Sequence, residues 1–299
     1  MVDNVHEAIA RAVSVPARPV RAEGIISLLN ADDSREDVTL IEAVRIKDGT
    51  LDAYNRYLDA TSPLAKEVLG ITDISFPGTG DMLSYADWKG GVIRLTRFSD
   101  RTDLIERMTS PQWQSALVDR DASVEDGIIL IGDKGSMPLW AKILLGPERP
   151  ASKFETPDID AMSPQQIVDA LLAVYPDGGA DPSRIQLDWM TTMPGFKDRP
   201  IHYLNLYAFG ESGSGEEHDA YNKSAMSTVR KYGAHPKYRS DVLHLLVSDV
   251  AWSRVVFVRW PSMRVMQDLR LNPEYLEAQK HRVASAEVYG NFVTHLRGD

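Results

Sequence analysis

Apolar and polar residues alternate along several short segments of the chain, and a period of two predicts β-strands. Residues 201–209, IHYLNLYAF, place Tyr203, Asn205 and Tyr207 on one face and apolar residues among those on the other. Apolar runs predict further strands at 38–46, 91–98, 127–131, 242–247, 252–260 and 291–296. The short run at 24–30, GIISLLN, is also expected to be a buried strand.

Apolar residues spaced by three and four predict helices between these strands. The expected helices cover 52–70, 101–108, 163–174 and a short stretch ending at Trp189. Ser110-Pro111 and Asn272-Pro273 each begin another helix, because a capping side chain precedes a proline at the first helical position. Ser163 and Gln166 have the spacing of a capping box.

The same order of elements occurs twice. From Arg259 onward the second copy aligns with the first, from Arg97, without a gap at a constant offset (259 − 97 = 162). Upstream, Asp219-Ala220-Tyr221-Asn222 repeats Asp52-Ala53-Tyr54-Asn55. A repeat of this length is too long for a solenoid unit, so the pattern predicts a duplicated domain.

Each copy has the order β-α-β-β-α-β, with the second helix broken in two, which is typical of a ferredoxin-like split βαβ fold of the α+β class. We expect an N-terminal arm over 1–23, a first repeat over 24–132, a linker with one or two helices over 133–199, and a second repeat over 200–299.

The composition of the chain argues against several classes of function. The chain has 299 residues and a net charge of −10, which opposes binding to nucleic acid or to anionic lipid. It contains no cysteine, so thiolate metal sites and cysteine nucleophiles are excluded. The N-terminal residues do not resemble a secretory signal, and no apolar run reaches the roughly 20 residues that span a bilayer. We therefore expect a cytoplasmic protein without a membrane partner.

The segment 252–285, WSRVVFVRWPSMRVMQDLRLNPEYLEAQKHRVAS, resembles the C-terminal half of the bacterial domain-of-unknown-function 1330 family. The resemblance rests on the Trp-x-x-Val start, the Arg-Trp-Pro-Ser turn and the Pro-Glu-Tyr helix that ends in His-Arg. It covers most of 199–296 and, in diluted form, 38–131. The chain departs from the family pattern at Ser253, where aspartate is usual, and the first copy has Asp119 in place of His281.

The resemblance implies a dimeric α/β barrel, in which two such sheets pair face to face. Two tandem repeats would let one chain form this barrel as an intramolecular dimer. The superfamily includes cofactor-free monooxygenases, isomerases, polyketide cyclases and haem enzymes, so the fold alone does not fix the function.

Four residues are the candidates for catalysis: His281, Arg282, Asn205 and Glu42. An imidazole at His281 would move a proton near neutral pH, while Arg282 and Asn205 would hold a developing oxyanion. A carboxylate at Glu42 inside a dry barrel would have a raised pKa. The alternative interpretations are structural: cations near a helix end, an amide that satisfies the backbone, and a glutamate paired with Arg97 or Arg259.

A second set of residues is expected to line the substrate site. They are Tyr203, Tyr207, Tyr221, His244, Arg259, Trp260, Tyr275 and Arg120. Arg259 is matched by Arg97 in the other copy, which favours a structural role, such as a duplicated salt bridge or carbonyl clamp, over two active sites. His244 is a lone strand histidine, and such residues are more often satisfied core or rim residues than ligands.

Three functions remain open. The first is a cofactor-free acid–base lyase, isomerase or cyclase acting on an apolar aromatic or polyketide-like substrate. The second is a haem-dependent or oxygen-activating monooxygenase, with haem ligated by His244 or His281. The third is a protein that binds a small ligand without catalysis. No metal-binding motif or phosphate loop is found in the sequence, and homodimer formation is left open.

Overall fold

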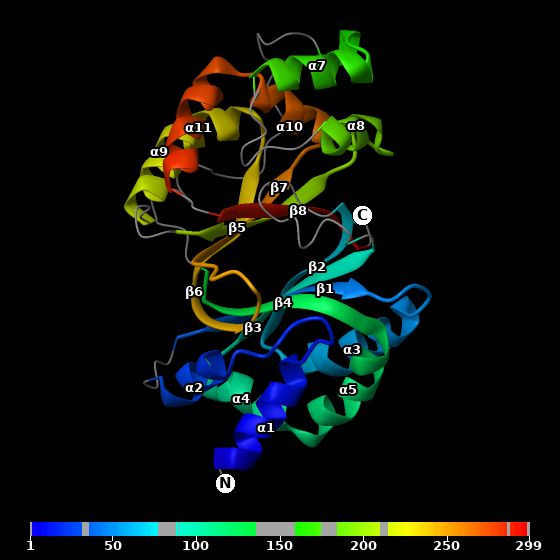
Figure 1. Ribbon diagram of the computed structural model, residues 1–299, viewed down its shortest axis with the longest axis vertical. Coiled ribbons are helices and arrows are strands. Elements are labelled where there is room, and N and C mark those ends of the chain that lie inside the picture. The colour runs from blue at the N-terminus through cyan, green and yellow to red at the C-terminus, as the bar shows by residue number, and fades with distance from the viewer. Residues whose placement is uncertain are drawn as a thin grey trace.

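Eight strands form one closed antiparallel barrel, and helices cover it on two opposite sides (Figure 1). The computed structural model describes residues 2–31, 36–76, 88, 90–135, 159–174, 184–209, 215–285 and 288–297. In the described part of the chain, no helix combines the length and the apolar character that crossing a membrane requires.

Both halves of the barrel have the expected order of elements. The first half contains β1 (Val38–Ile46), α3 (Leu51–Thr61), β2 (Glu67–Phe76), β3 (Gly91–Phe98), α4 (Arg101–Thr109), α5 (Pro111–Ser123) and β4 (Val124–Asp133). The second contains β5 (Ile201–Ala208), α9 (Gly215–Lys231), β6 (His235–Val247), β7 (Arg254–Trp260), α10 (Met263–Arg270), α11 (Pro273–Ser285) and β8 (Val288–Leu296). The predicted tandem β-α-β-β-α-β repeat, with a broken second helix, is confirmed.

The strand order explains how one chain closes the barrel. The first half has the order β4-β1-β3-β2 and the second has β8-β5-β7-β6. Strand β2 pairs with β8, and β4 pairs with β6, so each edge of one sheet is joined to an edge of the other. The two repeats therefore form an intramolecular dimeric α/β barrel, as expected, and no strand of the barrel keeps an open edge.

Apolar side chains fill the barrel interior and also the space between each sheet and its helices. Inside the barrel, Trp88 from the first half stacks on Phe292 of β8, with ring centroids 5.2 Å apart. Both side chains are buried. Because the opposite faces of the same strands pack against helices, most of the strand residues are buried on both faces.

One of the predicted strands is wrong. Residues 24–30 belong to a helix, α2 (Ala22–Asn30), not to a strand. Its buried residues Ile25 and Leu28 are three positions apart while Ile26 is exposed, which is a helical pattern that a short apolar run conceals. The N-terminal arm likewise contains a helix, α1 (Val2–Val13).

The helix expected over 52–70 ends early. Helix α3 stops at Thr61, a single 3-10 turn follows at η1 (Ser62–Leu64), and β2 begins at Glu67. Pro63 lies in that turn, where its ring prevents the helix from continuing. The remaining residues then pair with β3, with Glu67 opposite Arg97.

The linker contains two helices, α7 (Pro164–Val174) and α8 (Arg184–Thr192), and a 3-10 turn, η3 (Ile159–Ala161). The capping box is confirmed: Ser163 N–H donates to Gln166 Oε1 at 2.8 Å, and Gln166 N–H donates to Ser163 Oγ at 3.3 Å. Ser110 also caps α5 as expected, by accepting from the Trp113 N–H. The Pro/Gly-rich remainder of the linker, 136–158 and 175–183, lies outside the described residues.

Candidate functional site

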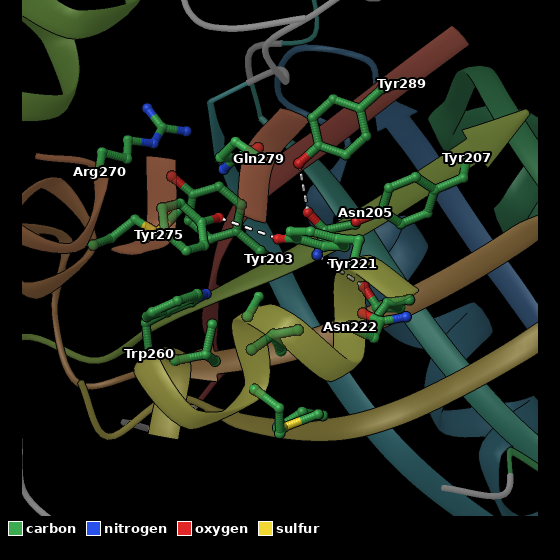
Figure 2. Close-up of a pocket in the computed structure, with 17 residues that line it drawn as sticks. Tyr203, Asn205, Tyr207, Tyr221, Asn222, Trp260, Arg270, Tyr275, Gln279 and Tyr289 are labelled. Carbon is green, nitrogen blue, oxygen red and sulfur yellow. Dashed lines mark hydrogen bonds between the residues drawn. The ribbon is translucent and has the colours of Figure 1, made fainter. Parts of the chain in front are cut away.

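A pocket opens between the second-half sheet and its helices α9, α10 and α11 (Figure 2). Its space amounts to about 750 Å³, part of which is open solvent. Aromatic and aliphatic side chains form most of the wall, and a few amides, phenols and one guanidinium interrupt it. The lining residues are Tyr203, Asn205, Tyr207, Tyr221, Asn222, Ala225, Met226, Val229, Pro236, Val256, Val258, Trp260, Met266, Arg270, Tyr275, Gln279 and Tyr289.

The alternation of β5 supplies the floor of this pocket. Tyr203, Asn205 and Tyr207 point toward the helices, whereas Leu204 and Leu206 belong to the apolar core inside the barrel. Because successive side chains of a strand point to opposite faces, the sequence pattern of β5 predicts that these three residues share one face.

A chain of hydrogen bonds crosses the pocket floor. The Asn291 amide nitrogen donates to Tyr289 Oη at 2.9 Å, and the Tyr289 hydroxyl donates to Asn205 Oδ1 at 2.8 Å (Figure 2). Asn205 Nδ2 in turn donates to the Val256 carbonyl oxygen at 3.1 Å. These bonds fix the orientation of the Asn205 amide. The amide retains one N–H and one lone pair on Oδ1 that these bonds do not use.

Phenol groups form the wall toward the helices. The Tyr221 and Tyr275 hydroxyls lie 3.3 Å apart and bridge α9 and α11. The Tyr203 hydroxyl donates to Met263 Sδ at 3.7 Å. Burial raises the pKa of Tyr203 to about 12, so this phenol stays protonated at neutral pH and acts as a hydrogen-bond donor rather than as a base.

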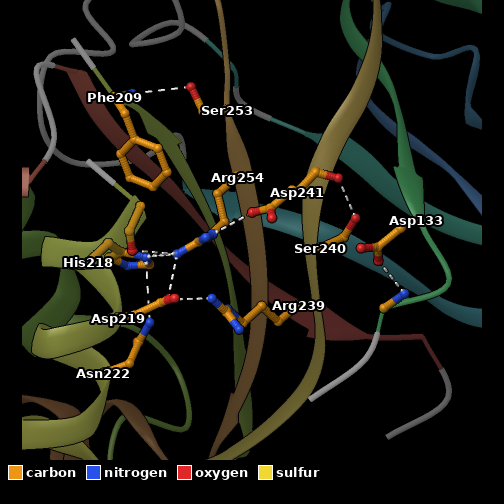
Figure 3. Close-up of polar contacts among 12 residues, drawn as sticks. Asp133, Phe209, His218, Asp219, Asn222, Arg239, Ser240, Asp241, Ser253 and Arg254 are labelled. Carbon is orange, nitrogen blue, oxygen red and sulfur yellow. Dashed lines mark hydrogen bonds and ion pairs between the residues drawn. The ribbon is translucent and has the colours of Figure 1, made fainter. Parts of the chain in front are cut away.

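A charged network supports one end of the pocket (Figure 3). The buried His218 ring lies 4.1 Å from the Tyr207 ring, centroid to centroid. Arg254 Nη1 donates to His218 Nδ1 at 2.9 Å and to Asp219 Oδ1 at 2.8 Å, and Arg254 Nε donates to Asp241 Oδ1 at 2.7 Å. Because a guanidinium only donates, His218 Nδ1 accepts, and the ring is held in one orientation behind the pocket wall.

The structure brings together many of the residues expected at the site. Asn205, Tyr203, Tyr207, Tyr221, Trp260 and Tyr275 all line the pocket. They come from four elements, β5, β7, α9 and α11. The roles assigned to them stay predictions.

His281, by contrast, was expected to line the cleft, and that placement is wrong. Its side chain is exposed on α11 and does not line the pocket. The helix is rotated so that Tyr275 and Gln279, four residues apart, face the sheet instead. The side chain of Arg282 lies outside the described residues.

Glu42 and Arg120 are buried in the other half. Glu42 does not point into the barrel: it faces the helices, where it accepts from the Tyr57 hydroxyl at 3.2 Å and pairs with Arg94 at 3.4 Å. The expected partners, Arg97 and Arg259, do not contact it, because Arg97 pairs with Glu67 at the strand end. The two candidates therefore lie away from the aromatic pocket.

His244 and Arg259 also lie away from the pocket lining. His244 Nδ1 is 3.0 Å from Ser27 Oγ, so this histidine joins β6 to α2. Burial, aided by the charge of Arg101, lowers its pKa. Arg259 is half-buried on β7 and lies opposite His202 of β5 in the sheet.

Sequence reasoning missed several lining residues. Gln279 lies one helical turn beyond Tyr275, so helical spacing was a usable signal. Tyr289 is the second residue of strand β8, and Arg270 is the last residue of helix α10. No local sequence pattern marks either residue. His218, which lies behind the pocket wall and does not line it, was also missed; it follows the glycine-rich segment 210–214, which lies outside the described part of the chain.

The pocket does not fit a haem group. No histidine is among the described residues that line it, and the two proposed ligands, His244 and His281, lie elsewhere. No group of three or more histidine, aspartate or glutamate side chains in the described part of the chain has the arrangement of a metal site.

Comparison with known proteins finds one match to a family model. Residues 211–295 match the model described as Domain of unknown function (DUF1330). No curated protein matches the chain in sequence.

Solved structures that resemble the chain are distant in sequence. A candidate monooxygenase from Fusobacterium nucleatum is 8% identical over 87% of this chain and 92% of its own, with a TM-score of 0.48. An anthrone oxidase-like protein is 9% identical over 88% and 94%, with a TM-score of 0.47. Chlorite dismutase from Candidatus Nitrospira defluvii is 9% identical over 89% and 94%, with a TM-score of 0.38.

Proposed function

We propose that the second-half pocket binds a small aromatic molecule that carries a phenolic or enolic oxygen, and that the protein is a cofactor-free oxygenase for that molecule. The observation that carries the proposal is the fixed Asn205 amide on the floor of an aromatic pocket. Tyr203, Tyr207 and Trp260 supply apolar surface for a flat ring, and Asn205 supplies a donor for its oxygen.

The choice of oxygenation over isomerisation follows from the residues of the lining. Proton shuttling in a lyase or isomerase needs a group that titrates near neutral pH. The described residues of the lining include neither histidine nor carboxylate, and burial raises the pKa of Tyr203 to about 12. Under the lyase or isomerase hypothesis, no side chain in the described lining could carry the proton, since His281 is exposed.

A substrate with an acidic C–H group does not need a basic side chain in the pocket. An activated methylene beside an aromatic ring loses a proton to solvent and transfers electrons to O₂. One oxygen atom ends on carbon as a ketone and the other leaves in water, so the atoms and electrons balance with O₂ as the only oxidant. The protein's contribution is to lower the pKa of the substrate by hydrogen bonding its oxygen from Asn205 and to keep the ring in an apolar site.

The test uses the purified full-length protein and anthrone as the probe substrate. Binding is measured by quenching of tryptophan fluorescence, and turnover by O₂ consumption together with the formed ketone. We expect saturable O₂ consumption that falls at least tenfold in Asn205→Leu and is unchanged in Val118→Ala, whose side chain is 67% exposed on α5. Binding without O₂ consumption for a series of phenols and anthrones would instead support a non-catalytic binding protein.

A further inference from the structure

The layer between sheet and helices in the first half contains two buried arginines whose hydrogen-bonding capacity is mostly unused. Arg94 of β3 and Arg120 of α5 are both 0% exposed. Arg94 donates from Nη1 to Thr61 Oγ1 at 2.8 Å and to Glu42 Oε2 at 3.4 Å. Arg120 donates from Nη1 to the Ser14 carbonyl oxygen at 2.5 Å.

The other edge of each guanidinium is buried without an acceptor among the described residues. No described atom accepts a hydrogen bond from Nε or Nη2 of Arg94, or from Nε or Nη2 of Arg120. These two nitrogens form the edge that binds both oxygens of a carboxylate in a bidentate arrangement. Two such edges are therefore buried without an acceptor.

Two neighbouring side chains, Tyr54 and Trp113, add further donors to the cluster. The Tyr54 hydroxyl and the Trp113 Nε1 are also buried without a hydrogen-bond partner. The Arg94 guanidinium carbon lies 5.8 Å from the ring centroids of both Tyr57 and Trp113, and the Tyr54 and Tyr57 rings lie 5.6 Å apart. Burial first, and then the charge of Glu42, raises the pKa of Tyr54, so its hydroxyl keeps its proton.

The charges of this cluster do not balance. Glu42 is the carboxylate that acts on Tyr54 and Tyr57, and Arg94 and Arg120 are the cations that act on them. Asp119, on the same helix as Arg120, instead pairs with Arg56 at the surface. One carboxylate against two guanidinium groups leaves a net charge of +1, and a buried donor without an acceptor is unfavourable.

Arg120 places one side of the cluster next to the surface. Although its side chain is buried, it borders a surface hollow together with Ser14, Val15, Pro16, Asp121 and Val124. The cluster occupies the layer that corresponds, by the repeat, to the aromatic pocket of the second half. We propose that Arg94 and Arg120 bind a small oxyanion of carboxylate type, so that the two halves hold ligands of different chemistry.

The test measures the effect of sodium formate on thermal unfolding of the full-length protein at constant ionic strength. A ligand that binds only the folded state raises the Tm with its concentration. We expect Glu42→Gln to bind formate at least threefold more tightly than the unmodified protein, because the cluster charge becomes +2. Arg120→Gln is expected to abolish the effect, and Arg97→Gln, which changes an arginine outside the cluster, is expected to leave it unchanged.

Two outcomes would overturn the proposal. One is a Tm that does not respond to formate in either the unmodified protein or Glu42→Gln, which would indicate that water satisfies the buried donors. The other is a response of equal size in the unmodified protein and Glu42→Gln, which would indicate binding elsewhere. Since Glu42→Gln keeps the size of the side chain, it decides the question even where Arg120→Gln fails to fold.

Discussion

Glu42 of β1 and Asn205 of β5 occupy the same position in the two halves of the barrel. Glu42 lies opposite Arg94 of β3 and Ile129 of β4, and Asn205 lies opposite Val256 of β7 and Asn291 of β8. One position thus carries a buried ion pair in the first half and a pocket amide in the second. Where the first half has Arg94, the second has the smaller Val256, which lines the pocket.

Loss of the Tyr289 hydroxyl should loosen the orientation of the Asn205 amide without unfolding the protein. In Tyr289→Phe, Asn205 Oδ1 loses its donor and Asn291 Nδ2 loses its acceptor. We expect the free energy of unfolding to fall by about 1–3 kcal/mol and turnover of anthrone to fall about tenfold. Urea denaturation and steady-state kinetics measure the two effects. Unchanged turnover would show that the amide need not be oriented.

Removal of the Glu42 carboxylate should have a larger effect on stability. Glu42→Ala leaves Arg94, which is 0% exposed, without its carboxylate partner. Breaking a buried pair from one side costs about 3–5 kcal/mol. The matched change in the other half, Asn205→Ala, leaves no buried charge and is expected to cost less. Urea denaturation of the two variants compares the costs, and equal values would contradict the assignment of Glu42 to a buried pair.

Protonation of His244 should destabilise the protein at acidic pH. Its folded-state pKa is lowered, so the unfolded chain binds the proton first as the pH falls. The free energy of unfolding should therefore decrease as the pH falls below about 6.5, the ordinary histidine pKa, and continue to decrease down to the folded pKa.

Replacement of this histidine isolates its contribution. His244→Gln is expected to show a smaller decrease in the free energy of unfolding between neutral and acidic pH than the unmodified protein. Leu243→Gln, an exposed neighbour on β6, serves as the control and should keep the full decrease. Parallel pH profiles for all three proteins would rule out a role for His244.

The contact between Trp88 and Phe292 should couple the two halves during unfolding. Phe292→Ala removes a fully buried ring from the barrel interior and is expected to cost about 3–5 kcal/mol. Because β2 and β8 share an edge, unfolding monitored by circular dichroism and by tryptophan fluorescence should give a single coincident transition. Two separate transitions would mean that each repeat folds as an independent unit.

The sequence by itself determined the local structure and the duplication. Strand faces such as that of Tyr203, Asn205 and Tyr207 follow from a period of two, and helix starts such as Ser110 follow from capping chemistry. These features depend on neighbours in the chain, so they are visible without coordinates. The repeat was visible because both copies kept the same spacing.

Only the tertiary structure decided which half is open and which residues meet in it. Asn205 and Tyr289 are 84 residues apart in the chain, and their hydrogen bond depends on how β5 and β8 pair. The exposure of His281 depends on the rotation of α11 against the sheet, which neighbouring residues on the helix do not fix. Packing between elements that are distant in the sequence sets these relationships, so a local sequence pattern cannot predict them.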